Sequence, residues 1–214
     1  YSRLQNPTCD MVAARIAALE GGTAAMLTGS GQAANFYAMF NIASCGDHIV
    51  ASSAIYGGTF NLISVTMKRM GIEATFISPD STYEQIVAAI QPNTKLVFGE
   101  TIANPALNVL DIEVFAKAAH DNGLPLIIDN TFPTPVNCRP IEWGADIVTH
   151  STTKYMDGHG SAVGGCIILG IGLNMLDLPK VRLRVGNMLP AIFLPLAYLP
   201  LAEILTQIFH TIGS

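Results

Sequence analysis

Four short polar segments of this 214-residue chain carry side chains that could bind a ligand or take part in catalysis. Each directly follows a short apolar run of the kind that forms a buried strand. They are residues 29–34, 100–104, 129–130 and 150–154. Together they supply glycine amides, carboxylates, hydroxyls and an amine at strand ends, which is where open α/β sheets bind their ligands.

The first segment has the form G-x-G-x-x-A, with Gly29, Gly31 and Ala34 at the fixed positions. At a turn from strand to helix, bare backbone N–H groups and the helix N-terminus favour an anionic phosphate. A plain glycine-rich turn is the alternative. A dinucleotide site would need an acidic residue at the end of the next strand to bind the ribose. That strand ends in Ser52 and Ser53, and a nicotinamide-dependent dehydrogenase is therefore disfavoured.

Lys154 comes almost immediately after an apolar strand, in the sequence His-Ser-Thr-Thr-Lys-Tyr. A lysine at that place must be solvated, paired or used covalently, because burying its charge alone is costly. Lysine is also the residue that forms imines with carbonyl compounds. The alternative is a loop lysine whose stem is packed and whose ammonium group is in water.

Asp129 ends a continuous apolar run at 125–128, so its carboxylate is expected at the mouth of the sheet. A buried carboxylate there needs a cationic partner. Residues 129–131 would equally suit a helix N-cap, and this alternative stays open.

These segments together match what pyridoxal 5'-phosphate requires. Lys154 would carry the cofactor's aldehyde as an imine, and Asp129 would keep the pyridine nitrogen protonated. Tyr56, which follows another strand, offers an aromatic face for the ring. The expected phosphate ligands are the amides of Gly31 and Gln32 and the hydroxyls of Ser151 and Thr153.

Alternating short strands and helices must position these groups. Strands are expected at 24–28, 48–52, 73–77, 95–99, 125–128 and 145–149, and helices at 10–20, 32–41, 59–70, 82–90 and 112–122, the first capped by Asp10. This alternation predicts the α/β class, with a mostly parallel sheet and helices on both faces. Residues 1–168 form the expected domain, incomplete at its N-terminus, and residues 169–214 form an apolar tail rich in proline and leucine.

Composition excludes several other functions. The formal charge is −5 without a basic stripe, which argues against nucleic-acid binding. The four cysteines form no C-x-x-C pair, so neither a metal site nor a disulfide framework is expected. Residues 188–212 are apolar, but three prolines, Glu203 and His210 interrupt them, which disfavours a membrane span. No leader is visible before Tyr1, and we expect a cytoplasmic protein.

Residues 1–168 resemble the Cys/Met-metabolism family of pyridoxal-phosphate enzymes, which has the large cofactor-binding domain of the aspartate-aminotransferase-like (type I) fold. The resemblance is carried by the sequences of residues 1–8, 99–106, 129–131 and 146–159, and the tail at 169–214 does not match the family. It implies the roles given above for Lys154, Asp129 and Tyr56, and places Asn104 beside the cofactor's phenolic oxygen. It also implies that Tyr1 and Arg3 reach the phosphate of a neighbouring subunit, hence a homodimer or homotetramer.

The resemblance further implies a γ-replacement in which O-acetyl-L-homoserine and sulfide give L-homocysteine and acetate, a step of methionine and cysteine metabolism. The substrate would be a small amino acid, with Lys154 as base and Tyr56 assisting the leaving group. A cystathionine γ-synthase or γ-lyase type of reaction is one alternative. Another is a truncated, inactive chain that binds only the cofactor or a full-length subunit, because the family's substrate-binding arginine matches neither Arg182 nor Arg184.

Overall fold

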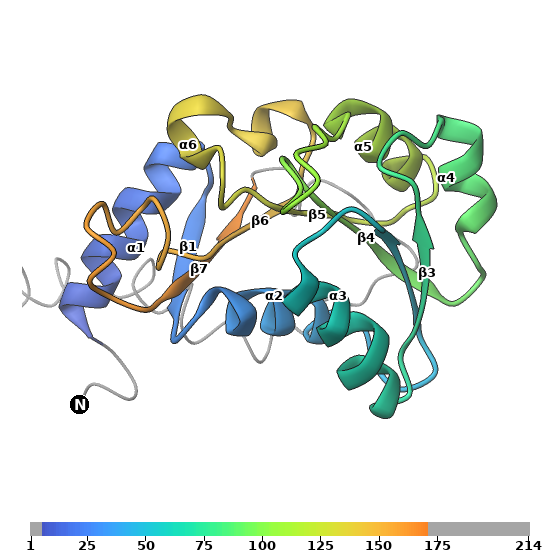
Figure 1. Cartoon of the computed structure of the whole chain (residues 1–214), viewed down its shortest axis with the longest axis horizontal. Helices are drawn as coiled ribbons and strands as arrows, with labels where there is room; N and C mark the ends of the chain where they lie inside the picture. Colours follow the sequence, from blue (N-terminus) through green and yellow to red (C-terminus); the bar gives the residue numbers. More distant parts are fainter. Residues whose placement is uncertain (1–5, 171–214) are drawn as a thin grey trace, which may run out of the picture.

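One sheet runs through the part of the chain that the computed structural model describes, residues 6–170 (Figure 1). Its seven strands have the order β1-β7-β6-β5-β4-β2-β3. They are β1 Ala24–Thr28, β2 His48–Ser52, β3 Glu73–Ile77, β4 Thr94–Glu100, β5 Leu126–Asp129, β6 Ile147–His150 and β7 Gly165–Leu169. β7 is antiparallel to both β1 and β6, and the other pairings are parallel. The expected α/β class and mostly parallel sheet are therefore confirmed.

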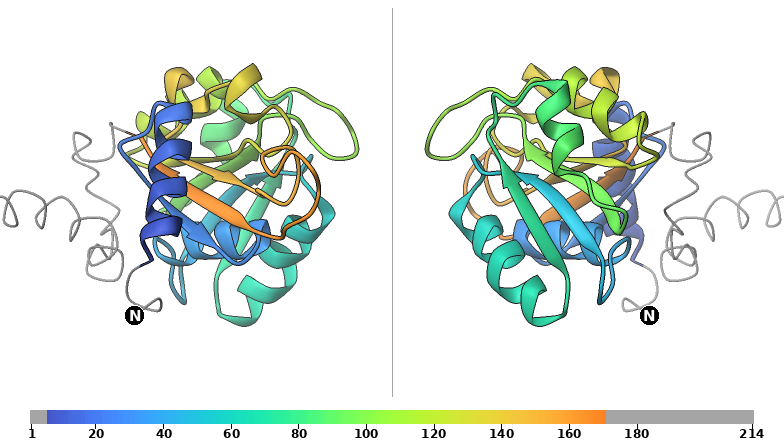
Figure 2. Two further views of the ribbon diagram at one scale, coloured as in Figure 1. Left: turned by 90° about the vertical axis from the view of Figure 1, so that its left-hand side faces the viewer. Right: turned by 90° about the vertical axis from the view of Figure 1, so that its right-hand side faces the viewer.

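Helices cover both faces of the sheet, as the side views in Figure 2 also show. In Figure 1, α4, α5 and α6 lie above the sheet, α2 and α3 lie below it, and α1 lies beside β1. The helices are α1 Pro7–Glu20, α2 Gly31–Phe40, α3 Gly57–Asn61, α4 Tyr83–Ala89, α5 Ile112–His120 and α6 Thr134–Asn137; the π-helix η1 is Leu62–Met67 and the 3₁₀ helix η2 is Pro140–Trp143. This two-layered cover explains why the central strands are apolar along their whole length.

The first helix begins earlier than its apolar pattern predicts. Asn6, not Asp10, is the N-cap, and its side chain accepts hydrogen bonds from the backbone N–H groups of Thr8 and Cys9. Pro7 fits the first helical position because it has no N–H to leave unpaired. Asp10 lies in the first turn, where its charge is favourable, so both residues support the same helix start.

Three other elements differ from the sequence prediction. The expected helix at 59–70 is divided into α3 and η1. The strand expected at 145–149 runs from Ile147 to His150, and the Asp146 carboxylate directly before it accepts a hydrogen bond from the N–H of Leu126. β7 was not predicted at all, although it inserts between β1 and β6.

The core lies on both sides of the central strands. Phe98 on β4, Phe115 on α5 and Met39 on α2 are fully buried and come from the three layers. The sheet therefore cannot shift relative to its helices without opening this packing, and the strand ends form a fixed platform.

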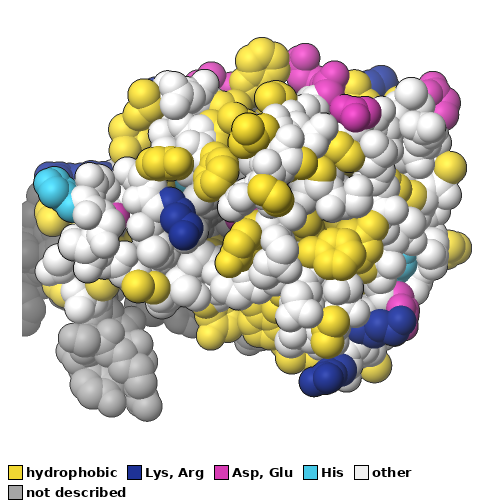
Figure 3. Space-filling model, viewed as in Figure 1, with side chains coloured by type: hydrophobic (Ala, Val, Ile, Leu, Met, Phe, Trp, Pro, Cys, Tyr) yellow, Lys and Arg dark blue, Asp and Glu magenta, His cyan; other side chains and the backbone are white. Residues whose placement is uncertain are grey.

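The surface carries many apolar side chains, which are spread over the face shown in Figure 3. The most exposed large ones are Val136, Val163 and Val109, with 87%, 73% and 69% of their area accessible. Among residues 6–170, no helix has the length and apolar character needed to cross a membrane. The apolar segment at 188–212 lies outside the described residues, as does the rest of the tail beyond 170.

Candidate cofactor site

A cavity of about 450 Å³ opens at the carboxyl ends of β4, β5 and β6. It is lined by Ser30, Gly31, Gln32, Asn35, Tyr56, Gly58, Thr59, Asn61, Glu100, Ile102, Asn104, Asp129, Thr131, Phe132, Ser151, Thr153 and Lys154. Every site residue predicted from the sequence within 6–170 is in this lining. Tyr1 and Arg3 lie outside the described residues.

The N-terminus of α2 forms one end of the cavity. Ser30 is the N-cap, and its hydroxyl accepts a hydrogen bond of 3.1 Å from the N–H of Ala33. The N–H groups of Gly31 and Gln32 precede the first intrahelical bond, so helix geometry leaves them without helical partners. Both residues line the cavity, which makes this end suitable for an anion.

Gly31 is in close contact with Ser151, which follows β6. A Cβ atom at position 31 would lie 2.4 Å from Cβ of Ser151 and 2.7 Å from its Cα. Only glycine therefore allows α2 and the segment after β6 to come together. This contact brings the Ser151 hydroxyl beside the free amides of α2.

Thr153 has a different hydrogen-bond arrangement from Ser151. Its hydroxyl accepts from the N–H of Gly164 at 3.0 Å and donates to the carbonyl oxygen of the same residue at 3.1 Å. It lines the cavity, but it must release the Gly164 carbonyl before it can donate to a phosphate.

Asp129 forms the floor of the cavity and is 8% exposed. Its Oδ2 accepts a hydrogen bond of 2.9 Å from Asn35, and its Oδ1 accepts from the N–H and the hydroxyl of Thr131. Within residues 6–170 it forms no ion pair. The helix-cap alternative was wrong, since the next helix begins at Thr134 with Pro133 as its N-cap.

Lys154 and Tyr56 lie at the open side of the cavity, and both are exposed. The lysine ammonium makes no hydrogen bond or ion pair within the described part of the chain. The Tyr56 ring packs over Gly58, where a Cβ atom would lie 2.4 Å from the ring. Gln32 fixes this loop to α2, because its side-chain amide donates to the Gly58 carbonyl at 2.8 Å.

Glu100, at the end of β4, is a site residue to which the sequence reasoning gave no role. Its Oε1 accepts a hydrogen bond of 2.8 Å from the N–H of Tyr56, so it holds the loop that carries the aromatic ring. Burial, reinforced by the negative charge of Asp129, raises the pKa of Glu100 to about 8. A neutral Glu100 relieves the repulsion between the two carboxyl groups.

Asn35 is the second residue that the sequence reasoning missed. It is a polar residue on the buried face of α2, where it donates to Asp129 and accepts a hydrogen bond from the Thr149 hydroxyl at 2.5 Å. An asparagine one turn after Gly31, in a mostly apolar helix, was the available signal. It links α2 to the ends of β5 and β6.

Replacing Gly31 by alanine is expected to weaken binding of pyridoxal phosphate roughly tenfold or more, about 1.4 kcal/mol. The new methyl group would collide with Ser151 and separate the two parts of the anion-binding end. Fluorescence titration of the cofactor-free protein measures this change. Gly29→Ala is the matched control, since a Cβ there meets nothing within 4 Å; equal affinities of the two variants would contradict the expectation.

The raised pKa of Glu100 predicts that the cofactor-free protein loses stability as the pH rises from about 4.5 to about 8. In this range the folded protein holds a proton that the unfolded chain releases, so the free energy of unfolding falls with pH. Glu100→Gln should remove this part of the slope. Urea unfolding across this range tests it, with the exposed Glu113→Gln as control, and an unchanged slope in Glu100→Gln would refute it.

The cavity fits pyridoxal phosphate by the chemistry of its donors. Free helix amides and a hydroxyl suit the phosphate, and a nearly buried carboxylate without a described cationic partner suits the protonated ring nitrogen. An exposed lysine without a described partner lines the same cavity and could hold the aldehyde. The requirement of Asp129 for a cation would thus be met by the cofactor itself.

The sheet is mostly parallel, and a lysine and an aspartate lie at the ends of neighbouring strands, beside a helix that begins with glycine. This is the arrangement of the large cofactor domain of type I pyridoxal-phosphate enzymes. The chain belongs to the Cys/Met metabolism PLP-dependent enzyme family, which it matches over residues 1–193. The resemblance noted from the sequence is confirmed, and the family's cofactor is the expected one.

Relatives within this family are named as sulfhydrylases or as homocysteine synthases. The chain is 51% identical over 170 residues to an O-acetyl-L-homoserine sulfhydrylase of Corynebacterium glutamicum, covering 79% of the chain and 39% of that protein. It is 48% identical over 169 residues to a homocysteine/cysteine synthase of Saccharomyces cerevisiae, with 78% and 38% covered.

A solved structure supports the fold and the cofactor. It is a putative O-acetylhomoserine (thiol)-lyase of Campylobacter jejuni that contains N'-pyridoxyl-lysine-5'-monophosphate. The identity is 41% and the TM-score 0.82, with 85% of this chain and 45% of the other covered. The chain thus spans less than half the length of these relatives.

Proposed function

We propose that this chain forms the cofactor domain of an enzyme that converts O-acetyl-L-homoserine and sulfide to L-homocysteine and acetate. The observation that carries the proposal is the placement of Lys154, Asp129 and the α2 N-terminus around one cavity. The names of the relatives support the choice of substrate. A small amino acid is therefore the expected substrate, and the reaction belongs to the cytoplasm.

Each residue has a defined task in this proposal. The amides of Gly31 and Gln32, with the hydroxyls of Ser151 and Thr153, hold the phosphate. Asp129 would keep the proton on the ring nitrogen, Tyr56 would cover the ring, and Asn104 would lie beside the phenolic oxygen. When bound, pyridoxal phosphate supplies an electron sink that stabilises carbanions of the substrate.

Lys154 performs the proton transfers. Its Nζ would hold the cofactor through the aldehyde carbon and, as a free amine, would remove and return protons on the substrate carbons. The exposed position of Lys154 leaves Nζ free to move between these places. Tyr56, at the same side of the cavity, is placed to assist departure of acetate.

A homodimer or homotetramer completes the proposal, with Tyr1 and Arg3 reaching the phosphate site of a neighbouring subunit. The association rests on the resemblance to the family, and size-exclusion chromatography with light scattering measures it.

The deciding experiment measures homocysteine release from O-acetylhomoserine and sulfide by the purified protein supplied with pyridoxal phosphate. Parallel reactions replace sulfide with cysteine or omit the nucleophile. Homocysteine in the first reaction supports the proposal. Product formed only with cysteine would instead support the cystathionine γ-synthase type, and a keto acid formed without nucleophile would support the γ-lyase type. No product despite bound cofactor would support the inactive alternative.

A further inference from the structure

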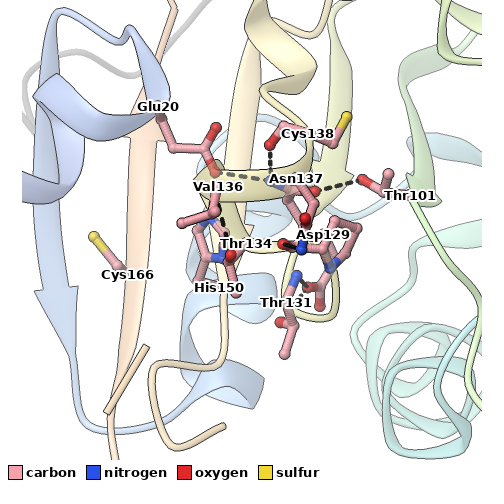
Figure 4. Close-up of polar contacts among 12 residues, drawn as sticks. Glu20, Thr101, Asp129, Thr131, Thr134, Val136, Asn137, Cys138, His150 and Cys166 are labelled. Carbon is pink, nitrogen blue, oxygen red and sulfur yellow. Dashed lines mark hydrogen bonds and ion pairs between the residues drawn. The ribbon is translucent and has the colours of Figure 1, made fainter. Parts of the chain in front are cut away.

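A fully buried pair of titratable side chains lies behind the cofactor cavity, and the proposed chemistry does not use it. Glu20, the last residue of α1, and His150, the last residue of β6, both have 0% exposure. His150 Nε2 lies 2.5 Å from Glu20 Oε1. Figure 4 shows both side chains between α1 and the strand ends, near Asp129.

The Glu20 carboxylate also contacts the neighbouring strand end. Its Oε1 accepts a hydrogen bond of 2.9 Å from the side-chain amide of Asn130. The same amide donates to the Cys138 carbonyl at 2.8 Å, and Asn130 Oδ1 accepts from the Thr101 hydroxyl at 2.9 Å. One oxygen atom of Glu20 therefore connects the ends of β5 and β6.

The two residues that contact Glu20, His150 and Asn130, are each adjacent in sequence to a residue of the cofactor site. His150 precedes Ser151 at the phosphate end, and Asn130 follows Asp129 at the ring-nitrogen end. Thr131 also connects Asp129 and Ser151, on the cavity side, because its hydroxyl donates to the Asp129 carboxylate and accepts from the N–H of Ser151. The spacing between the two ends of the cofactor site is thus fixed from both sides.

Stability alone does not account for this pair. Glu20 Oε2 and His150 Nδ1 are buried without a hydrogen-bond partner among the described residues. Removing two polar groups from water is costly, and an apolar pair of similar volume often gives equal or greater stability. What an apolar pair would lack is the directional contact that sets the distance between two strand ends.

We propose that Glu20, acting through His150 and Asn130, is a positioning residue for the cofactor site. It holds Asp129 and Ser151 at the separation that one pyridoxal phosphate molecule requires. The inference rests on the proposed site, but its test reads cofactor binding instead of homocysteine formation, so the two proposals can fail separately.

The test replaces both members together, as Glu20→Leu with His150→Phe, so that no buried charge is left unpaired. The expected result is thermal stability near that of the wild type, roughly tenfold weaker binding of pyridoxal phosphate, and a reduced visible circular dichroism of the bound cofactor. The dichroism reports how the ring is held. Wild-type affinity together with wild-type dichroism would overturn the proposal.

The matched control is Asp146→Asn. Asp146 is also a buried carboxylate, paired with His120 at 2.8 Å, but it lies at the opposite end of β6. Its substitution should lower thermal stability without changing cofactor affinity or dichroism; equal losses of affinity in this control and the double variant would overturn a specific role for Glu20.

Glu20→Gln serves as the conservative variant and keeps the test decisive if the double variant does not fold. Glutamine retains an oxygen that can accept from Asn130 but loses the charge toward His150. Its affinity for pyridoxal phosphate should lie between those of the wild type and the double variant. If the double variant does not fold, the affinity of Glu20→Gln should be two- to tenfold below that of the wild type, a loss of roughly 0.4 to 1.4 kcal/mol in binding free energy. An affinity equal to the wild type would contradict the proposal.

Discussion

Replacing Lys154 by alanine is expected to lower homocysteine formation about 10²- to 10⁴-fold, the usual contribution of a positioned acid or base. The variant should also lose covalent attachment of pyridoxal phosphate, because no other lysine lines the cavity formed by the described residues. Initial rates measure the first effect. Borohydride reduction followed by peptide mapping measures the second and should label position 154 only in the wild type.

Lys117→Ala is the control for this substitution. Lys117 is an exposed lysine of α5 that pairs with Asp121 and does not line the cavity. Its removal should leave rate and labelling unchanged. Homocysteine formation that survives in Lys154→Ala would disprove the assigned role of this lysine.

Replacing Asp129 by asparagine is expected to reduce turnover by roughly 10²- to 10³-fold, since it removes the charge that stabilises the protonated ring nitrogen. The cofactor should remain attached to Lys154, because the amine is intact. Asparagine nearly preserves the shape of the side chain, but its NH2 group would replace an acceptor by a donor beside Asn35 or Thr131, which both now donate to Asp129. Rates and absorption spectra of the loaded variant separate the loss of turnover from loss of cofactor.

Asp111→Asn provides the comparison for that substitution. Asp111 caps α5 far from the cavity lining, and asparagine is an equally good N-cap. We expect wild-type turnover in this control. Turnover in Asp129→Asn equal to that of Asp111→Asn would show that Asp129 has no electronic role.

The sequence predicted the site residues that lie directly at the end of a strand or at the start of a helix. Asp129 ends an apolar strand and Lys154 follows another. Parallel strands bring their carboxyl ends to one edge of the sheet, so the proximity of the two residues could be inferred without coordinates. The G-x-G-x-x-A turn could likewise be placed at a helix N-terminus, where Gly31 is found. The strand and helix alternation gave the α/β class for the same reason.

Residues whose roles depend on distant partners could not be predicted. Glu100 receives its raised pKa from burial and from Asp129, and Asn35 acquires its role only when α2 packs against β5 and β6. Glu20 lies at the end of an ordinary amphipathic helix, 130 residues before its partner His150. The antiparallel β7 was missed because its four apolar residues follow a long turn instead of a helix.

The late position of β7 in the chain limits when the cofactor can be bound during synthesis. β1 hydrogen-bonds only to β7 within the described sheet, and α2 with its free amides begins directly after β1. About 140 residues separate the two strands, so roughly 7 to 30 seconds of translation pass between them. Until then β1 has no partner strand, and Gly31 has no fixed place beside Ser151. We therefore expect pyridoxal phosphate to bind after β7 has paired with β1, and to stabilise the chain from that stage on.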